Sequence, residues 1–319
     1  MDNNLQDIDK NKRSLWSKFN KTINRDKYLY IMSLPGLIML VMFSYIPMYG
    51  IIIAFKRYNP GVGIMGSQWV GFYYFESFLN DIYAWRAFRN TFLLGLYGLF
   101  WGFPLPIILA LLLNEVRVSW FKRSIQTITY LPYFISVVII VGLMKELLSP
   151  VTGIINNELV RIGILDKPIN FFAEAKWFRT LYIGSDIWAG TGFGAIIYLA
   201  ALSGINPELY EAAIIDGATR WQRIWYISIP GILPTATILF ILSVGGIVGA
   251  GSVQKVLLMY SSQTYETADV ISTYVYRMGI ENINYSYATA VGLLMSVIGF
   301  VFTLVTNYIS RTLSDTSLW

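Results

Sequence analysis

The sequence of 319 residues contains no cysteine and no histidine. Without cysteine the chain cannot form a disulfide framework, a thiolate metal site or a thiolate nucleophile. Without histidine it lacks the most common general base and the most common metal ligand. A zinc enzyme and a Ser-His-Asp hydrolase are therefore excluded. We expect no catalytic residues and no metal site in this chain.

Charge is also scarce. Only 13% of the residues are charged, whereas 55% are apolar, and soluble domains contain about 25% charged residues. Six stretches of 20 or more residues lack Asp, Glu, Lys and Arg, and each is long enough for one membrane-spanning helix. We therefore predict an all-α membrane protein with six transmembrane helices. The stretches are 28–55, 90–114, 124–144, 187–207, 224–254 and 282–310.

Details of these stretches refine the prediction. Asp186 precedes the fourth stretch, so we expect that helix to begin near Arg179. Parts of the fifth stretch are expected to form a surface loop. Prolines inside the stretches are expected to kink the helices or to lie near their ends. They are Pro35, Pro47, Pro104, Pro106 and Pro132.

The positions of Lys and Arg suggest an orientation. Seven of the 24 basic residues lie in the first 27, mixed with four acids, which indicates a cytoplasmic tail rather than a nucleic-acid site. An even number of helices then places both termini in the cytoplasm. The predicted organisation is a cytoplasmic tail (1–27), a six-helix domain (28–311) and a second cytoplasmic tail (312–319). The seven basic residues are Lys10, Lys12, Arg13, Lys18, Lys21, Arg25 and Lys27.

Two segments between helices, 56–89 and 149–179, contain many aromatic residues, glycines or prolines. Both are expected to be ordered external caps. Their Trp and Tyr side chains suit the membrane interface, and docking of an external protein is the alternative interpretation.

The most informative segment is polar and lies between two apolar stretches. Asn206-Pro207-Glu208 is a helix-start signal, with a polar cap, proline in the first turn and an acid at the positive end of the helix dipole. Gly217 is expected to end that helix with a positive φ. A second amphipathic piece, 221–229, is expected to follow, with Pro230 and Pro234 at the turn into the next membrane helix. The segment 204–230 therefore predicts a helix-turn-helix on the cytoplasmic face.

This segment resembles the EAA loop of binding-protein-dependent ABC importer permeases of type I. Their motif has Glu-Ala-Ala, three residues, Gly, and later Ile-x-Leu-Pro. Here Glu211-Ala212-Ala213 precedes Asp216-Gly217, and Ile227-Ser-Ile-Pro230 ends the segment. Ile229 in place of Leu is the one departure.

The resemblance implies a six-helix permease core that does no chemistry itself. Its expected partners are a second, related permease, an ATPase dimer and an extracellular solute-binding protein, with membrane lipid around it. This chain would bind no cofactor, and ATP and magnesium would be held by the ATPase. Glu211 would make a charged contact with the ATPase, Ala212 and Ala213 would allow close packing, and Gly217 would set the turn. ATP binding would move the loop and switch the cavity between inward-facing and outward-facing states.

Further segments resemble the carbohydrate branch of this family, and within it the subgroup for oligosaccharides and polysaccharide fragments. The implied function is uptake of such sugars across the bacterial cell membrane by alternating access. The resembling segments are 130–136, 197–202, 269–279 and 285–293.

Comparison with maltose permeases implies which residues line the sugar cavity. Asp186 would hydrogen-bond sugar hydroxyls, and Trp188 or Phe193 would stack on a sugar ring; an acid near the outer interface is the alternative explanation of Asp186. Small residues replace an aromatic residue and amides of those permeases, which predicts a wide cavity for long substrates; close helix packing is the alternative. The full predicted set is Asp186, Trp188, Ala189, Gly190, Phe193, Gly246, Ile247 and Ala250.

Three other functions were considered. An ion-coupled secondary transporter would need buried acids and inverted repeats, and only Asp186 is of that kind. A membrane-bound enzyme would need paired carboxylates inside the membrane, and none line up. An ABC permease for a non-sugar solute would share the same loop.

Overall fold

The computed structural model describes residues 25–314 and 317–318. Five helices in this part are long and apolar enough to cross a membrane, and a bent helix pair can supply a sixth crossing. The predicted all-α fold is therefore confirmed. Most basic residues of the N-terminal tail (10–21), and residues 315, 316 and 319 of the predicted C-terminal tail, lie outside the described residues. The continuous crossings are Arg25–Phe55, Ile82–Glu115, Ala175–Ser203, Arg220–Gly245 and Tyr285–Thr312.

Most crossings combine several helical elements. The first contains η1 (Val41–Tyr45), α2 (Ile46–Met48) and η2 (Tyr49–Phe55). The second is built from α5 (Ile82–Tyr97), η3 (Gly98–Gly102) and α6 (Pro104–Glu115). With the bent pair counted as the third crossing, the fourth is built from η5 (Ala175–Trp177) and α10 (Phe178–Ser203). The fifth consists of α12 (Arg220–Arg223), η6 (Ile224–Ser228) and α13 (Ile229–Gly245), and the last lies within α17 (Tyr285–Ser314).

The third predicted helix, 124–144, is broken, so its prediction as one continuous helix was wrong. Helices α7 (Ser119–Tyr130) and η4 (Leu131–Phe134) end at an extended residue, Ile135, and α8 (Val137–Leu147) leaves at an angle of 100°. Pro132 cannot donate a backbone hydrogen bond, and the hydroxyl of Ser136 caps the new helix at the amide of Val138. Proline and a cap residue together explain the break.

The fifth predicted helix also differs from expectation. No turn separates the amphipathic piece from the membrane helix, because one helix runs from Arg220 to Gly245 with Pro234 inside it. A π-helical turn, η6, precedes Pro230, and the amide of Ile229 bonds to the carbonyl of Ile224. Such wide turns absorb the local mismatch at a proline. The helix ends at Gly245, before the short η7 (Ile247–Gly249).

Helix α10 is the centre of the packing and contacts α6, α7 and α13. Its buried residues Ala195, Tyr198 and Leu202 form one core cluster with Ala110 and Ile232. Gly192 allows close approach to α7, because a Cβ there would lie 2.0 Å from the carbonyl oxygen of Thr129.

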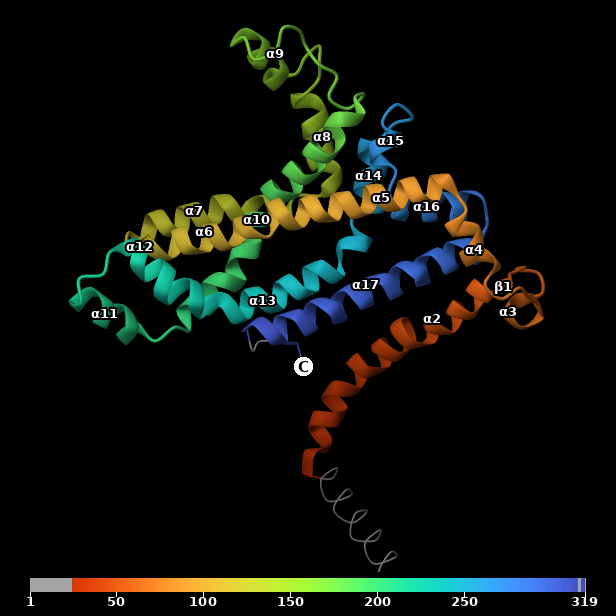
Figure 1. Cartoon of the computed structure of the whole chain (residues 1–319), viewed down its shortest axis with the longest axis horizontal. Coiled ribbons are helices and arrows are strands. Elements are labelled where there is room, and N and C mark those ends of the chain that lie inside the picture. The colour runs from red at the N-terminus through yellow and green to blue at the C-terminus, as the bar shows by residue number, and fades with distance from the viewer. Residues whose placement is uncertain (1–24, 315–316, 319) are drawn as a thin grey trace, which may run out of the picture.

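The short elements gather at the two ends of the bundle. Helix α11 (Pro207–Ile215) and α12 lie at one end of the view in Figure 1, opposite the hairpin and α4. The hairpin pairs β1 (Lys56–Arg57) antiparallel with β2 (Gln68–Trp69). The remaining short elements are α3 (Gly63–Gly66), α4 (Tyr73–Leu79), α9 (Ile154–Arg161), α14 (Val253–Met259), α15 (Tyr265–Ala268), α16 (Ile271–Tyr276) and η8 (Arg277–Glu281).

A buried charge fastens the end of the bundle near α15 and α16. Asp269 is fully buried, and its carboxylate accepts a hydrogen bond of 2.7 Å from Arg277 and faces Arg86 at 3.9 Å. The amide of Asn90 donates to the carbonyls of Glu266 and Asp269. Paired in this way, the buried carboxylate holds α5 to the segment after α14.

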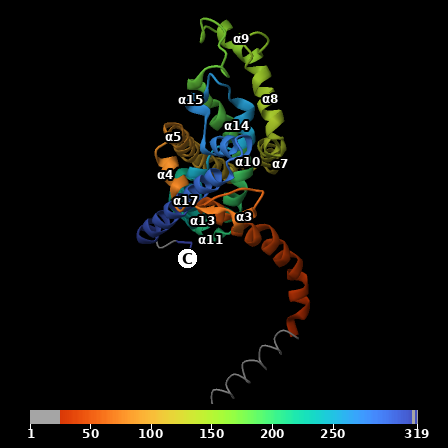
Figure 2. The ribbon, with the colours of Figure 1, turned by 90° about the vertical axis from the view of Figure 1, so that its right-hand side faces the viewer.

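The first crossing lies apart from the others. It extends away from the bundle in both views (Figures 1 and 2), and 6% of its apolar window is buried. Apolar side chains therefore face outward around most of this helix.

Candidate transport pathway and coupling loop

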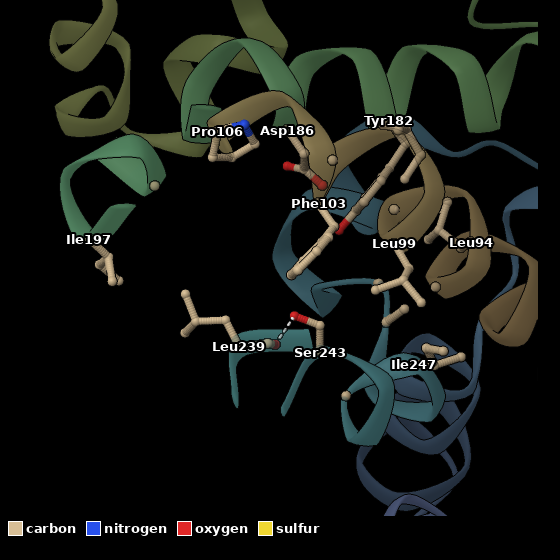
Figure 3. A pocket seen from close by; sticks show the side chains of 18 of the residues that line it. Leu94, Leu99, Phe103, Pro106, Tyr182, Asp186, Ile197, Leu239, Ser243 and Ile247 are labelled. Carbon is tan, nitrogen blue, oxygen red and sulfur yellow. Dashed lines mark hydrogen bonds between the residues drawn. The ribbon is translucent and has the colours of Figure 1, made fainter. Parts of the chain in front are cut away.

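A cavity of about 480 Å³ lies between α5, α10 and α13. Its walls approach closely because a Cβ at Gly95 would lie 2.6 Å from the carbonyl oxygen of Ile247, and one at Gly194 would lie 3.2 Å from Pro106. In Figure 3, Asp186 and Tyr182 lie across the cavity from Leu239, Ser243 and Ile247. The other lining residues are Leu94, Gly95, Gly98, Leu99, Gly102, Phe103, Pro106, Ile183, Gly194, Ile197, Tyr198, Gly246, Ala250 and Gly251.

Asp186, the one charged residue among the described residues that line this cavity, forms an ion pair with Lys255. Nζ of Lys255 donates hydrogen bonds to Oδ1 of Asp186 and to the carbonyl of Tyr182, and it lies over the Tyr182 ring. The side chain of Lys255 is 4% exposed, whereas that of Asp186 is 52% exposed. Burial lowers the pKa of Lys255, and the charge of Asp186 opposes that shift. The Asp186 carboxylate therefore faces the cavity, and the buried ammonium group of Lys255 balances its negative charge.

The structure places half of the predicted cavity residues on the wall. Asp186, Gly246, Ile247 and Ala250 line it. The other four predicted residues do not: Trp188 is half exposed elsewhere on α10, and Phe193 stacks on Tyr133 with ring centroids 3.9 Å apart. The remaining two, Ala189 and Gly190, are not lining residues; Gly190 shares a helix face with Asp186 and Gly194.

Neighbouring glycines of the run 245–251 have different roles. A Cβ at Gly245 would lie 2.1 Å from Oγ1 of Thr303, so this residue lets α13 pack against α17. At Gly246 a Cβ would meet only carbonyls of its own helix, and the residue faces the cavity. Gly251 has a φ of +93°, which favours glycine. Gly245 therefore lies at a close helix contact, whereas Gly246 lines the cavity.

The polar loop has the local structure that the sequence predicts. Oδ1 of Asn206 accepts from the amide of Glu208 at the start of α11. Gly217 has a φ of +77°, and the amide of Ala218 bonds to the carbonyl of Ala213 in a helix-ending motif. Thr219 and Gln222 then form a reciprocal cap at the start of α12. The predicted helix-turn-helix is confirmed, with the second helix continuing into the bundle.

The predicted coupling residues are on the surface. Glu211, Ala212, Asp216, Gly217 and Pro230 are exposed, and Ala213 is half buried. Glu211 has no ion-pair partner within residues 25–314. Large apolar side chains are exposed around them, which is typical of a docking surface. They are Leu209, Ile214, Ile215, Trp221, Trp225 and Tyr226.

Two contacts hold this loop to the bundle. The hydroxyls of Tyr210 and Ser228 lie 2.9 Å apart, and Ser228 is buried. Arg223 faces Glu115, at the end of α6, at 3.9 Å. The loop is therefore bound both to the helix that follows it and to a neighbouring one.

Sequence reasoning missed Lys255 as the partner of the cavity residue Asp186. The lysine directly follows the fifth apolar stretch, 224–254. The one signal was its isolation, because no other charged residue lies between Arg223 and Glu266. The short helix α14 carries Lys255 back toward α10.

The comparisons with known proteins agree with this arrangement. The family described as "Binding-protein-dependent transport system inner membrane component" matches residues 102–315. The chain belongs to that family. It is a multi-pass permease of the inner membrane, and its family acts with a binding protein and an ATPase. The resemblance to ABC importer permeases is thus confirmed.

Several relatives are similar over nearly their full length. Protein LplB of Bacillus subtilis is 43% identical over 93% of this chain and 92% of its own. The polygalacturonan/rhamnogalacturonan transport system permease protein YteP of the same organism is 40% identical over 92% and 91%. A chain of the bacterial alginate ABC transporter, solved with an alginate pentasaccharide-bound periplasmic protein, is 44% identical with a TM-score of 0.84, covering 93% of this chain and 99% of that one. The type I permease fold is therefore shown.

Proposed function

We propose that this permease forms one half of the pathway of an ATP-driven importer of oligosaccharides or polysaccharide fragments, delivered by an extracellular solute-binding protein. The substrate class is supported by relatives named for polygalacturonan/rhamnogalacturonan, arabinooligosaccharides and alginate. A cavity of about 480 Å³ is in the range of small-molecule sites, about 300–1,000 Å³.

One observation supports the mechanism most strongly. A single helix runs from Arg220 in the loop to Gly245 beside the cavity, and Leu239 and Ser243 on it line the wall. At 1.5 Å per residue its 26 residues extend about 39 Å. Because the helix is continuous, a displacement of the loop moves the cavity wall with it. This is the rigid-body switching that alternating access requires.

The force is supplied by a partner ATPase that docks on the exposed loop and holds ATP and magnesium. Glu211 offers a carboxylate at the surface of α11 that has no ion-pair partner among the described residues, and Ala212 beside it allows close approach. This chain contributes no group to ATP hydrolysis.

A second, related permease completes the pathway. The first crossing exposes apolar side chains around most of its surface and extends away from its own bundle. Lipid covers part of such a helix, and a second permease covers the rest. Both termini lie in the cytoplasm in this arrangement, with α11 on the same side.

The substrate hydroxyls bind at Asp186. Its carboxylate is half exposed toward the cavity while Lys255 holds it in place. Because this acid is already paired, it is a poor candidate for the coupling acid of an ion-driven transporter.

The test is purification of the tagged chain from its native membrane in mild detergent, followed by identification of the co-purifying proteins and measurement of ATP hydrolysis. We expect a second permease, an ATPase, and hydrolysis stimulated by the sugar-loaded binding protein. A chain that purifies without an ATPase contradicts the proposal.

A further inference from the structure

A second cavity, of about 420 Å³, also involves α5 and α10. It lies beside the first cavity, because Ile183 lines both. Two aromatic rings, Tyr97 and Trp101, belong to α5 and η3. Two basic residues, Lys176 and Arg179, belong to η5 and α10. The remaining lining residues are Thr180, Ile183, Gly184 and Ile187.

Arg179 is held in place but lacks an ionic partner. Its Nη2 donates to Oδ1 of Asn90 at 2.9 Å, and Asn90 is itself fixed by two carbonyls that accept from its amide group. Nε of Arg179 is buried without a hydrogen-bond partner, and within residues 25–314 no carboxylate lies in ion-pair contact with it.

Lys176, the other basic residue, differs from Arg179 in its exposure and in having an ionic partner. Lys176 is exposed at the rim and pairs with Glu174 at 2.8 Å. An exposed pair of this kind contributes little stability, and Glu174 balances the charge of Lys176. Arg179 is the group that can bind an anion directly, because a guanidinium matches a carboxylate with two parallel hydrogen bonds.

The two rings supply the second half of a sugar site. Tyr97 is 43% exposed and Trp101 is 55% exposed, so neither is closed off by this chain's own packing. Aromatic side chains present a flat apolar face and a polar edge, which suits the alternating C–H faces and hydroxyls of a pyranose. The lining also includes the hydroxyl of Thr180 and the small residue Gly184, which fits a sugar better than an acyl chain.

We propose that this second cavity is a subsite for a negatively charged sugar, a pyranose that carries a carboxylate, with Arg179 binding the carboxylate and Tyr97 and Trp101 packing on the ring. This inference rests on the proposed oligosaccharide import. It extends the pathway beyond the Asp186 cavity, and it selects acidic over neutral oligosaccharides.

The experiment uses the complete transporter, reconstituted in vesicles with its binding protein, and measures initial uptake of a galacturonic acid trisaccharide and of a neutral galactose trisaccharide. The variants are Arg179→Gln, which keeps a hydrogen-bond donor near Asn90, and Arg179→Lys, which keeps the charge. Lys167→Gln is the matched control, since Lys167 is an exposed basic residue of the preceding segment outside the cavity.

We expect Arg179→Gln to raise the half-saturating concentration of the acidic sugar about tenfold, which corresponds to about 1.4 kcal/mol. In Arg179→Gln the half-saturating concentration of the neutral sugar should change less than about twofold, which corresponds to much less energy. In Lys167→Gln the half-saturating concentration of either sugar should also change less than about twofold. Arg179→Lys keeps the positive charge and should restore much of the uptake of the acidic sugar. If the wild type transports only the acidic sugar, the two sugars cannot be compared, and this restoration is then the test of a charge contact.

Other outcomes overturn the inference. An equal loss for both sugars with normal amounts of protein would make Arg179 structural. An effect that disappears in vesicles of phosphatidylcholine alone would assign the cavity to an anionic lipid headgroup. Failure of the wild type to import either sugar would contradict the proposed function itself, which distinguishes the two claims.

Discussion

Lys255 on α14 donates a hydrogen bond to Oδ1 of Asp186 on α10 at 2.5 Å, although 69 residues separate them in the chain. The lysine is almost fully buried, and the aspartate is half exposed toward the cavity. The pair thus joins the helix that lines the pathway to the short helix behind it. It also makes that part of the wall neutral overall.

The two partners should respond differently to mutation. Asp186→Asn leaves a buried ammonium without its counter-charge, whereas Lys255→Met leaves a carboxylate that water can reach. We expect Asp186→Asn to cost about 2 kcal/mol, below the usual range for a buried pair because Asp186 is half exposed. Lys255→Met should cost less, and the double variant should recover part of the loss. Thermal unfolding in detergent measures all three, and equal costs for the single variants would contradict this account.

Narrowing the cavity should select by substrate length. Gly246→Leu adds a side chain to the cavity wall at a position where a Cβ meets only carbonyls of its own helix, at 3.4 Å or more. Uptake of long oligosaccharides should fall before that of disaccharides. Gly249→Leu is the control, since nothing lies within 4 Å of a Cβ at Gly249 and the residue does not line the cavity. Equal loss at all lengths would assign Gly246 to helix packing.

Close packing of α10 on α7 depends on one glycine. Gly192→Ala would place a Cβ 2.0 Å from a backbone oxygen of Thr129, which flexible side chains cannot relieve. We expect a loss of about 1–3 kcal/mol or more, typical of overpacked sites. Gly190→Ala, two residues away, meets nothing within 4 Å and should keep normal stability. Membrane accumulation and thermal unfolding of both variants test this difference, which equal stabilities would refute.

Binding of the ATPase to the coupling loop should depend on the charge of Glu211 and on the turn at Gly217. Glu211→Ala should weaken ATPase binding about tenfold or more, as for other interfacial charge contacts, while Glu208→Gln on the same helix should leave it nearly unchanged. Gly217→Val places a branched residue at a φ of +77°, which is strained, and should also weaken ATPase binding. Gly217→Asn should weaken it less, because asparagine adopts a positive φ more readily. Co-purification of the ATPase with each variant is the measurement. Normal ATPase binding by Glu211→Ala would remove this residue from the docking contact.

Local signals in the sequence predicted the loop well. Asn206 and Gly217 act within a few residues of the backbone groups that they affect, so their effects can be predicted from the sequence. The reciprocal cap of Thr219 and Gln222 was not predicted. The break after Pro132 and the continuity through Pro230 could not be predicted with the same rule. Whether a proline breaks a helix depends on its neighbours, here an extended Ile135 in one case and a π turn in the other.

Long-range contacts account for the rest. The ion pair of Lys255 and the placement of Phe193 against Tyr133 depend on how separate helices pack. A periodic pattern shows which residues share a face of one helix, but not which helix that face meets. The orientation of the termini and the roles of the coupling residues stay predictions.

The central claim is ATP-driven import of oligosaccharides through a pathway that this chain lines. The most direct test is accumulation of a labelled oligosaccharide in vesicles that contain the complete transporter, with the loaded binding protein outside its external face and ATP at the ATPase. We predict accumulation against a gradient that requires both ATP and the binding protein and is lost in Glu211→Ala. Accumulation without ATP, driven by an ion gradient alone, would contradict the account.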